Sequence, residues 1–567
     1  MFRRAARGSG IGAQQMGDSN RNKFTRRAAL TGGAVVLAGV GTYAFRGRSA
    51  RGFTLSTADA RTLNRGNGAE PDSLDPHKAQ GQWENNIIGD MFVGLMTEDS
   101  AANAVFGAAE SYTVSDDGLT YRFKIRDHTW SDGVPVTAHD FEYSFRRIAD
   151  PKFAAQYVSI LYPIRNMEAV STGKLPVDRL GVRAVDDRTL ELQFHFEVPY
   201  IEQLLTHFTT FAVPKHVVEK YGDHWMRPEN IAVNGPYTLK QWIPNDHVRL
   251  EKNPRFYDAA KVRIEHVTFY PTQDSEAALK RVRGGDFDLL TDSLPPQKID
   301  WLRQNMANEL RLWPFILSQY VQFNVQRKPF DDIRVRQALS LAIDREVMCS
   351  KVERAGEQPA YALIPPGMPG YPGNARVAFH AMPMAARLEK AKALLAEAGY
   401  GSRNPLAFDY SMIMTTEAKL ISVALQEMWH QVGVNVRLTP SETQVHYAVL
   451  RKHDFDVAWA GWVADYRDPK NYLYLFQAST SDMNYGGYLN PKFEALVAQS
   501  DNMRDAHARG LVLQQAEQVL LDDVVVAPVY FGVTRDLVSP QVKGWISNNV
   551  NVNRTRYLSL DRSVTTV

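Results

Sequence analysis

The sequence predicts an α/β protein that is divided into two or three lobes. The chain has 567 residues, whereas a single hydrophobic core stops growing near ~250–300 residues. Segments that alternate apolar and polar residues are mixed with segments of helical period along the whole chain, which is typical of α/β folds. Apolar residues make up 44% and charged residues 23% of the chain, so the composition is that of an ordinary soluble globular protein.

Two segments show the period of two that a half-buried strand requires. Apolar side chains alternate with basic or hydroxyl side chains throughout 119–126, and a similar pattern returns in 190–194. These segments are therefore predicted to be strands. The stretch 361–374 is rich in proline and glycine and is predicted to be a long surface loop.

Other segments carry the helical period. The segment 389–400 has an apolar stripe and is followed by a stop at Gly399, a residue that commonly ends helices. The segment 421–438 predicts a helix that stops at Gly433 and continues as a strand. Thr137 precedes an amphipathic segment and is predicted to be the N-cap of a helix.

The N-terminus is predicted to be an export signal over residues 1–60. The pair Arg26 and Arg27 directly precedes an apolar run that is diluted by glycine, a pattern that resembles a twin-arginine signal. Cleavage is predicted near Ala60, where small residues flank Asp59. No cysteine follows the apolar run, so the mature protein is not expected to be a lipoprotein. An uncleaved membrane anchor is the alternative.

Charge and cysteine content exclude several partners. The first 60 residues carry ten basic and two acidic side chains, which leaves a net charge of −6 on the rest of the chain. A mildly acidic body argues against nucleic acid as a partner, because such a partner requires a basic face. The single cysteine, Cys349, excludes an internal disulfide and a cysteine-based zinc site, and it is predicted to be a buried thiol.

No pattern indicates catalysis, a metal or a cofactor. The chain has no HExxH, GxSxG, GxGxxG or P-loop sequence, and its 14 histidines never fall at HxH or HxxxH spacing. An SxxK match at Ser171 to Lys174 lies in a loop-like stretch and is interpreted as a chance match. We therefore expect a protein that is not an enzyme.

Several long segments together resemble a known family. They are NRGNGAEPDSLDPHKAQG (64–81), GAAESYTVSDDGLTYRFKIRDHTWSDGVPVTAHDFEYSFRR (107–147), NGPYTLKQWIPNDHVRLEKNPRFYD (234–258), KPFDDIRVRQALSLAIDRE (328–346) and FDVAWAGWVADYRDP (455–469). In this order, they resemble the oligopeptide-binding proteins of ABC importers, and the resemblance covers essentially residues 61–567.

The resemblance implies a periplasmic binding protein with two hinged main lobes and an inserted extra lobe, a three-lobed flytrap that encloses its ligand. The first main lobe would comprise 61–92, 218–316 and 534–567. The inserted lobe would comprise 93–217, and the second main lobe 317–533. The hinges would then fall near 316–317 and 533–534.

The resemblance also implies ligand-binding residues. A buried carboxylate is needed to pair the terminal ammonium of a peptide, and in the W-x-A-D-Y stretch this residue is Asp465. Segments that would pair the peptide backbone match Gly461 to Ala464 and the stretch near Tyr320. Tyr157 matches a tyrosine near the ammonium, and together with Trp462 and Tyr320 it would supply rigid walls. For Asp465 the alternative is a turn cap, and for the aromatic residues it is an ordinary core position.

This sequence departs from the family at other positions. Val463 stands where relatives can carry a cysteine, and Leu317 occupies the expected partner position. Basic residues that meet peptide carboxylates in relatives correspond here to Arg451, Glu353 and Trp459, of which only Arg451 is basic. The resemblance therefore predicts weaker or relocated capture of the peptide C-terminus, and Glu353 would favour cationic ligands.

The function implied by the resemblance is that of a monomeric periplasmic receptor. It would capture short peptides and deliver them to the permease subunits in the inner membrane. Alternatives within the same fold are a murein peptide, a nickel complex, haem or an oligosaccharide as cargo. A periplasmic peptidase and a receptor that signals or chaperones without a transporter are the alternatives from other classes.

Overall fold

The computed structural model describes residues 61–291, 294–480 and 483–563. All of these described residues belong to one unit by their contacts. The predicted export signal, with Arg26 and Arg27, and the predicted cleavage near Ala60 lie outside the described residues. None of the helices described is long and apolar enough to cross a membrane.

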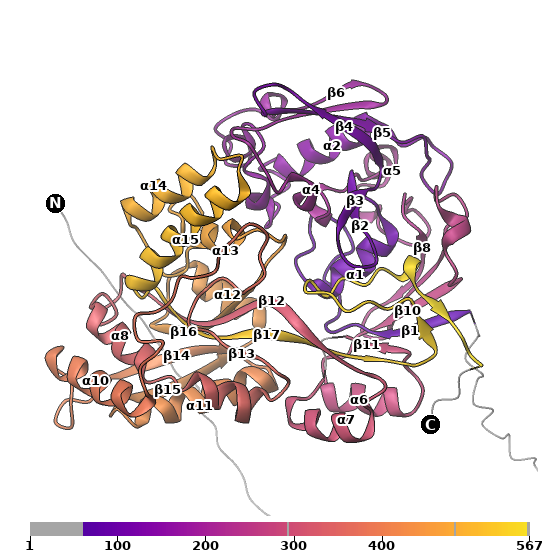
Figure 1. The fold of residues 1–567 in the computed structure, drawn as a ribbon. Helices are drawn as coiled ribbons and strands as arrows, with labels where there is room; N and C mark the ends of the chain where they lie inside the picture. Colours follow the sequence, from indigo (N-terminus) through magenta and orange to yellow (C-terminus); the bar gives the residue numbers. More distant parts are fainter. Residues whose placement is uncertain (1–60, 292–293, 481–482, 564–567) are drawn as a thin grey trace, which may run out of the picture. The chain divides into compact units, whose positions relative to one another are not determined.

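One eleven-stranded sheet runs through this unit (Figure 1). Its strand order is β15-β14-β16-β12-β17-β11-β1-β10-β9-β8, and β13 pairs with β17 off this path. The strands are β1 (Thr62–Gly66), β8 (Tyr237–Ile243), β9 (His247–Lys252), β10 (His266–Tyr270), β11 (Leu289–Leu290), β12 (Leu310–Phe323), β13 (Gln358–Pro359), β14 (Ala407–Ile413), β15 (Asn435–Ser441), β16 (Val457–Val463) and β17 (Val526–Val538).

Strands β12 and β17 join the two halves of this sheet. They are antiparallel and pair from Leu310 with Leu537 to Gln322 with Val526, with a register shift between Pro314 and Ser318. At one end of this pair β11 adds to β17, and at the other end β16 adds to β12. The strands that precede β12 in the sequence therefore connect to β14–β16 only through these two strands.

A four-stranded antiparallel sheet in the order β4-β5-β7-β6 forms within the segment 93–217. The strands β5 and β7 confirm the two strands predicted from period-two patterns, because Tyr121, Phe123 and Ile125 are buried while their polar neighbours are not. The remaining strands are β2 (Met96–Glu98), β3 (Ala104–Phe106), β4 (Ala109–Val114), β5 (Thr120–Ile125), β6 (Val182–Asp186), β7 (Thr189–Gln193), β18 (Val542–Lys543) and β19 (Ser559–Leu560).

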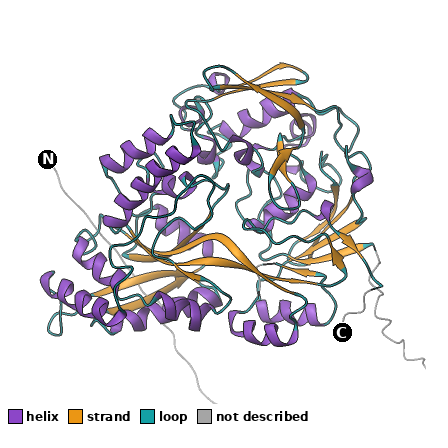
Figure 2. Cartoon of the chain, viewed as in Figure 1, coloured by secondary structure: helices purple, strands orange, loops and turns teal. Residues whose placement is uncertain are grey.

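Helices pack against these sheets (Figure 2). Those of the first half of the chain are α1 (Gln82–Met91), α2 (Ala138–Ala149), α3 (Met167–Ser171), α4 (Ile201–Leu204), α5 (Lys215–Tyr221), α6 (Ser275–Arg283) and α7 (Ile299–Asn305). Those of the second half are α8 (Ile333–Leu341), α9 (Arg345–Val347), α10 (Met384–Glu397), α11 (Thr416–His430), α12 (Thr443–Arg451), α13 (Lys470–Leu473), α14 (Pro491–Ser500) and α15 (Ala506–Asp522).

The hydrophobic core is divided, as the chain length predicted. One large cluster is built mainly from residues between Leu63 and Phe269. A second cluster joins α8, α10 and α11 to the sheet, and a third joins α13, α14 and α15 to it. Both of these are built from residues beyond Ile316.

The predicted helix ends are confirmed. The helices α10 and α11 are followed by Gly399 and Gly433, whose φ angles are 91° and 81°, and this left-handed conformation favours glycine. Both helices begin earlier than predicted. The helix α2 begins directly after Thr137, and the carboxylate of Asp140 accepts a hydrogen bond from the Thr137 N–H at 2.9 Å.

The stretch 361–374 has neither helix nor strand, as predicted, but part of it is buried. Leu363 is fully enclosed, and the carboxylate of Glu517 accepts hydrogen bonds from the backbone N–H groups of Leu363 and Ile364 at 2.7 and 2.8 Å. The prediction of a surface loop was therefore wrong for this part. Buried backbone donors need partners, and a buried carboxylate from α15 supplies one that no local pattern shows.

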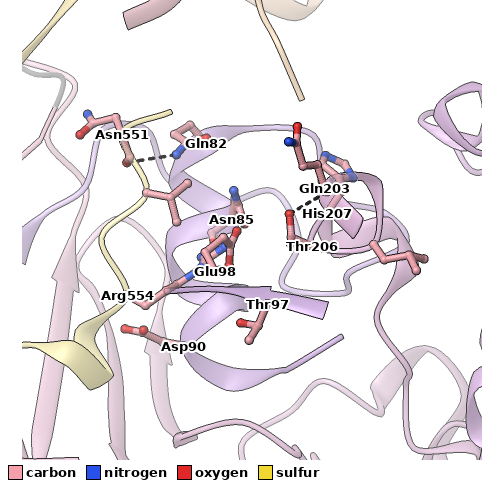
Figure 3. A network of polar contacts seen from close by, with 12 residues as sticks. Gln82, Asn85, Asp90, Thr97, Glu98, Gln203, Thr206, His207, Asn551 and Arg554 are labelled. Atoms are coloured by element: carbon pink, nitrogen blue, oxygen red, sulfur yellow. Dashed lines mark hydrogen bonds and ion pairs between the residues drawn. The ribbon is translucent and has the colours of Figure 1, made fainter. Parts of the chain in front are cut away.

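The C-terminal segment is fastened to α1 and β2 by Arg554 (Figure 3). Its guanidinium donates to the backbone oxygen of Asn85 at 2.7 Å and pairs with Glu98 at 2.9 Å. A Cβ on Gly89 would lie 1.8 Å from the Arg554 Nη1. A side chain at this position of α1 would therefore displace the Arg554 guanidinium from its hydrogen-bond partners.

Candidate functional site

The strand β16 contains the predicted backbone-binding segment. It pairs with β12 along its whole length, from Phe323 opposite Val457 to Leu317 opposite Val463. On its other side β14 pairs only with Val457 and Ala458. Among the strands that the structure describes, none pairs with the edge of β16 at 459–463. Side chains already bond to the backbone oxygens of Trp459 and Ala460, so the groups available to an added strand lie mainly at 461–463.

Gly461 lies at the centre of this edge. A Cβ at this position would approach the Gln319 Oε1 to 2.7 Å, while the Gln319 Nε2 donates to the backbone oxygen of Ala460 at 2.7 Å. A side chain would therefore displace a buried amide that is already satisfied. The N–H of Ala464 donates to the backbone oxygen of Ile316 at 3.2 Å, where the strand ends.

Asp465 follows directly and is almost completely enclosed, with 9% of its side chain exposed. Its Oδ1 accepts a hydrogen bond from the Tyr157 hydroxyl at 2.5 Å, and its Oδ2 accepts one from the Asn471 Nδ2 at 3.3 Å. An ionised carboxylate has about four acceptor sites. Two protein donors therefore leave Asp465 able to accept hydrogen bonds from a ligand.

No lysine or arginine in the described part of the chain forms an ion pair with Asp465. The His207 Nε2 lies 3.9 Å from the Asp465 Oδ1, but burial lowers the pKa of His207 to about 3, and the charge of Arg554 acts in the same direction. The imidazole is therefore neutral at ordinary pH. Burial raises the pKa of Asp465 to about 6, although the hydrogen bonds from Tyr157 and Asn471 oppose this rise. A buried carboxylate without a cation is a site that favours a cationic ligand.

Tyr157 comes from the segment 93–217, 308 residues away from Asp465 in the sequence. Its ring stacks on the His207 ring with centroids 5.4 Å apart and on the Phe208 ring at 6.5 Å. Burial first, and then the charge of Asp465, raise the pKa of Tyr157 well above its usual value. The hydroxyl therefore remains protonated and donates to Asp465.

Trp462 joins the same cluster through Asn471. The Trp462 Nε1 donates to the Asn471 Oδ1 at 2.8 Å, and the backbone N–H of Asp465 donates to the same oxygen at 3.0 Å. The Trp462 ring lies 6.0 Å from the Tyr474 ring at an angle of 71°. The Tyr474 hydroxyl is buried and has no hydrogen-bond partner among the described residues, so it is a further polar group that a ligand can satisfy.

Tyr320 and Trp459 lie deeper in the sheet. Tyr320 is buried on β12 and belongs to the cluster packed under α13–α15, with its ring 6.4 Å from that of Phe476. Trp459 packs against His446, which contacts the Trp459 backbone oxygen at 3.0 Å. Tyr320 therefore occupies a core position, which was the alternative to its predicted role as a ligand wall, whereas Trp459 is only partly buried.

The predicted carboxylate-binding positions do not lie with Asp465 in one hydrogen-bonded cluster. Arg451 is the last residue of α12 and is exposed. Glu353 is 1% exposed and pairs with Arg535 at 3.3 Å, which also contacts Glu357 and Glu417. Burial, followed by the charge of Glu417, raises the pKa of Glu353 to about 9, so Glu353 is mainly protonated at neutral pH and belongs to a separate buried cluster.

Two surface cavities lie away from this site. One, of about 390 Å³, is lined by residues that include Asp274 and Thr416, and the other, of about 760 Å³, includes Cys349 and Glu357. Neither cavity is lined by Asp465 or by the residues that hydrogen-bond to it. No group of residues in the described part of the chain could hold a metal ion.

The sequence prediction missed Asn471, His207 and Tyr474. Asn471 follows the W-x-A-D-Y stretch by only a few residues, but no periodicity or motif marks an amide that folds back onto it. His207 and Tyr474 reach Asp465 through tertiary packing, which no local pattern reports.

A comparison with protein families identifies this architecture. Residues 103–484 match the family described as bacterial extracellular solute-binding proteins, family 5. The chain belongs to this family. It is 38% identical over 498 residues to the periplasmic oligopeptide-binding protein OppA of Salmonella typhimurium, covering 87% of this chain and 91% of that protein. The resemblance to oligopeptide-binding proteins is confirmed.

Solved structures agree with this assignment. Haemophilus influenzae OppA in complex with the peptide RPPGFSPFR has a TM-score of 0.82 and 34% identity, covering 88% of this chain and 99% of that one. The Escherichia coli murein tripeptide binding protein MppA gives 0.83 at 34% identity and 89% and 99% coverage. The unliganded open form of MppA gives only 0.70 at the same identity, with 89% and 98% coverage. The predicted fold class is confirmed, and the chain is less similar to the open form.

Proposed function

We propose that this protein is the periplasmic solute-binding component of an ABC-type importer, and that it captures short peptides through the N-terminal ammonium and the backbone. The observation that carries the proposal is Asp465, a buried carboxylate that has two neutral donors and no cation. A peptide ammonium would supply the missing charge and would form a charge-assisted hydrogen bond.

The edge of β16 supports backbone binding. An extended peptide with its ammonium at Asp465 would lie close to the unpaired edge at 459–463. Main-chain hydrogen bonds of this kind do not depend on the ligand's side chains, so they are suited to a receptor for peptides of many sequences. Gly461 and Val463 lie on this edge, and Trp462 adds an aromatic wall.

Closure around the ligand is part of the proposal. We infer the lobes 61–92, 218–316 and 534–567, the inserted lobe 93–217 and the lobe 317–533, with hinges near 316–317 and 533–534. Strands β12 and β17 contain these positions and are the strands through which the halves of the large sheet connect. A small rotation in two strands would open the molecule and separate Tyr157 from Asp465.

The cellular role follows from the relatives. The OppA relatives of Salmonella typhimurium and Escherichia coli are periplasmic proteins, and we propose the same location for this protein after twin-arginine export and cleavage near Ala60. The relatives are binding proteins, so we propose that this chain delivers peptides as a monomer to permease subunits in the inner membrane and catalyses no reaction.

Calorimetric titration tests the proposal directly. The protein, produced from the full chain and refolded to remove bound peptide, is titrated with di- to pentapeptides and with N-acetylated counterparts. We expect binding of the free-amine peptides only, and Asp465→Asn should weaken it by about 30-fold or more, since removing one partner of a buried charged pair costs roughly 2–5 kcal/mol. The variant should fold, because it replaces a buried charge with a neutral amide. Equal binding of acetylated and free-amine peptides would refute the role of Asp465 as the group that binds the peptide ammonium.

A murein peptide is the second candidate, and the TM-score of 0.83 to MppA favours it. A murein tripeptide also carries a free amine, so Asp465 does not discriminate between the two. Titration with the murein tripeptide and, in parallel, with an ordinary tripeptide distinguishes the two cargoes. Binding of the murein tripeptide alone would assign the protein to that cargo.

A further inference from the structure

Asn471 is a buried amide that forms hydrogen bonds with Asp465 and with the neighbouring Trp462. It has 0% exposure, and its Oδ1 accepts both the Asp465 N–H at 3.0 Å and the Trp462 Nε1–H at 2.8 Å. Its Nδ2 donates to the Asp465 Oδ2 at 3.3 Å. The Asn471 side chain thus contacts the backbone N–H and the carboxylate of Asp465 as well as the Trp462 indole.

The two donors to Asp465 differ in origin. Tyr157 reaches it from the segment 93–217, whereas Asn471 lies six residues further along the chain, at the start of α13. On the proposed function, opening of the lobes withdraws Tyr157 but leaves Asn471 in place. Asn471 would then be the side-chain donor that keeps the Asp465 carboxylate oriented before a ligand arrives.

The segment around Asn471 is held in place by buried hydrogen bonds and ion pairs. The N–H of Asn471 donates to the backbone oxygen of Asp468 at 3.0 Å, and the Asp468 carboxylate forms two hydrogen bonds with the Arg509 guanidinium at 2.7 and 3.0 Å. Lys470 pairs with Asp501 in the buried interface with α14. Because its supports are buried, the Asn471 amide has a defined position from which to orient its partners.

We propose that Asn471 is a positioning residue that fixes the Asp465 carboxylate and the Trp462 indole for recognition of a ligand ammonium. This inference rests on the proposed function and deepens it. The residue acts through Asp465, so it sets how well the anchor accepts an ammonium rather than contacting the ligand itself.

The substitution Asn471→Asp separates positioning from packing. Aspartate has nearly the same shape, and it retains an oxygen for the Asp465 N–H and the Trp462 indole. It replaces the Nδ2 donor with a second carboxylate oxygen close to the Asp465 Oδ2. Like charges at this distance disfavour ionisation, so the pKa of Asp465 should rise.

Asn484→Asp is the matched control. Asn484 is also buried, and its amide bonds to the backbone N–H and oxygen of Tyr488 at 2.9 and 2.8 Å. None of its hydrogen bonds involves Asp465, Asn471 or Trp462. Both substitutions therefore place a carboxylate in a buried turn, but only one faces the anchor.

Two measurements test the role. Carboxyl NMR of 13C-aspartate-labelled protein, with Asp465→Asn to identify the resonance, gives the pKa of Asp465 without a ligand. Calorimetry gives the affinity for a free-amine tripeptide as a function of pH. We expect Asn471→Asp to raise this pKa by a unit or more, to weaken binding at pH 7 about tenfold or more, and to shift the pH midpoint of binding upward. Asn484→Asp should change none of these.

The outcomes are distinct. If Asn471→Asp lowered only the melting temperature, as a buried charge at Asn484 would, and left the pKa of Asp465 and the affinity unchanged, the positioning role would be refuted. If the unsubstituted protein bound no free-amine peptide, the proposed function would fail, while the pKa of Asp465 in the variant would still decide the role of Asn471.

Discussion

At the scale of single residues, the chemistry of the site depends on a carboxylate in a neutral, buried environment. The titratable groups that face Asp465 are Tyr157 and His207 from the segment 93–217 and three tyrosines from its own side, Tyr466, Tyr472 and Tyr474. The tyrosines have raised pKa values and His207 has a lowered one. Between pH 5 and 8, Asp465 is therefore the group of this cluster that changes its charge.

This predicts that affinity for a peptide ammonium falls on acidification. Asp465 has a pKa of about 6 without a ligand, so below pH 6 a proton must leave before the ammonium can pair, and affinity should fall about tenfold from pH 7 to pH 5. The free energy of unfolding of the ligand-free protein changes in the opposite direction: because the pKa of Asp465 is raised on folding, its contribution to stability increases as the pH falls from 7 to 4. Calorimetry over this range measures the affinity, and Asp465→Asn is the control whose residual binding should not follow the same titration.

At the scale of elements, the segment 464–471 carries Asp465 and also contacts the segment 93–217. The same turn that carries Asp465 carries Tyr466, whose ring stacks on Tyr200 with centroids 4.7 Å apart and nearly parallel planes. Lys470 lies over the Phe196 ring at 4.5 Å, and Arg504 pairs with Glu197 at 2.5 Å. These contacts join the segment 93–217 to the segment 317–533, so they exist only while the proposed lobes are closed.

Loss of these contacts should speed ligand release. An aromatic pair contributes ~0.5–1.5 kcal/mol beyond its buried area, so Tyr200→Ala should raise the dissociation rate about threefold to tenfold. The association rate should stay nearly constant, because the stack forms after capture. Stopped-flow tryptophan fluorescence measures both rates.

Two further variants make this test specific. Tyr200→Phe keeps the ring and should retain slow release. Arg504→Gln alters a side chain that is 65% exposed, so it should accelerate release slightly without disturbing a core. Dissociation at the parent rate in Tyr200→Ala would show that the stack does not hold the closed state.

The sequence was informative where a pattern is local or is shared along a family. Period two identified β5 and β7, glycine identified the ends of α10 and α11, and the W-x-A-D-Y stretch led to Asp465. It was uninformative where burial joins distant residues. The surroundings of Glu353 depend on Arg535, which lies on β17, and no local pattern links the two. Likewise, the role of Asn471 depends on how one turn folds back onto the strand before it.

At the scale of the whole molecule, the two proposed halves connect through β12 and β17. They also meet through side chains, both around the site and away from it, where Arg535 pairs with Glu353 and Arg354 with Asp300. The greater similarity to liganded OppA than to the open form of MppA indicates an arrangement in which Tyr157 already reaches Asp465. Without a ligand, the Asp465 charge is buried and uncompensated, which disfavours this arrangement. A ligand ammonium removes that cost and should shift the population toward closure.

Small-angle scattering should therefore detect compaction on ligand binding. The radius of gyration of a compact chain of this size is ~24 Å, and a saturating free-amine tripeptide should lower it by about 1 Å, because a rotation at two hinge strands brings the lobes together. The N-acetylated tripeptide should leave the radius unchanged, since it lacks the cation that compensates Asp465.

Asp465→Asn provides the decisive comparison, because the neutral amide removes the charge that opposes closure. Without a ligand this variant should be more compact than the parent, and it should respond less to the tripeptide. An unchanged radius in a parent sample that calorimetry shows to be saturated would contradict closure, and the binding energy would then have to come from a groove that is already formed.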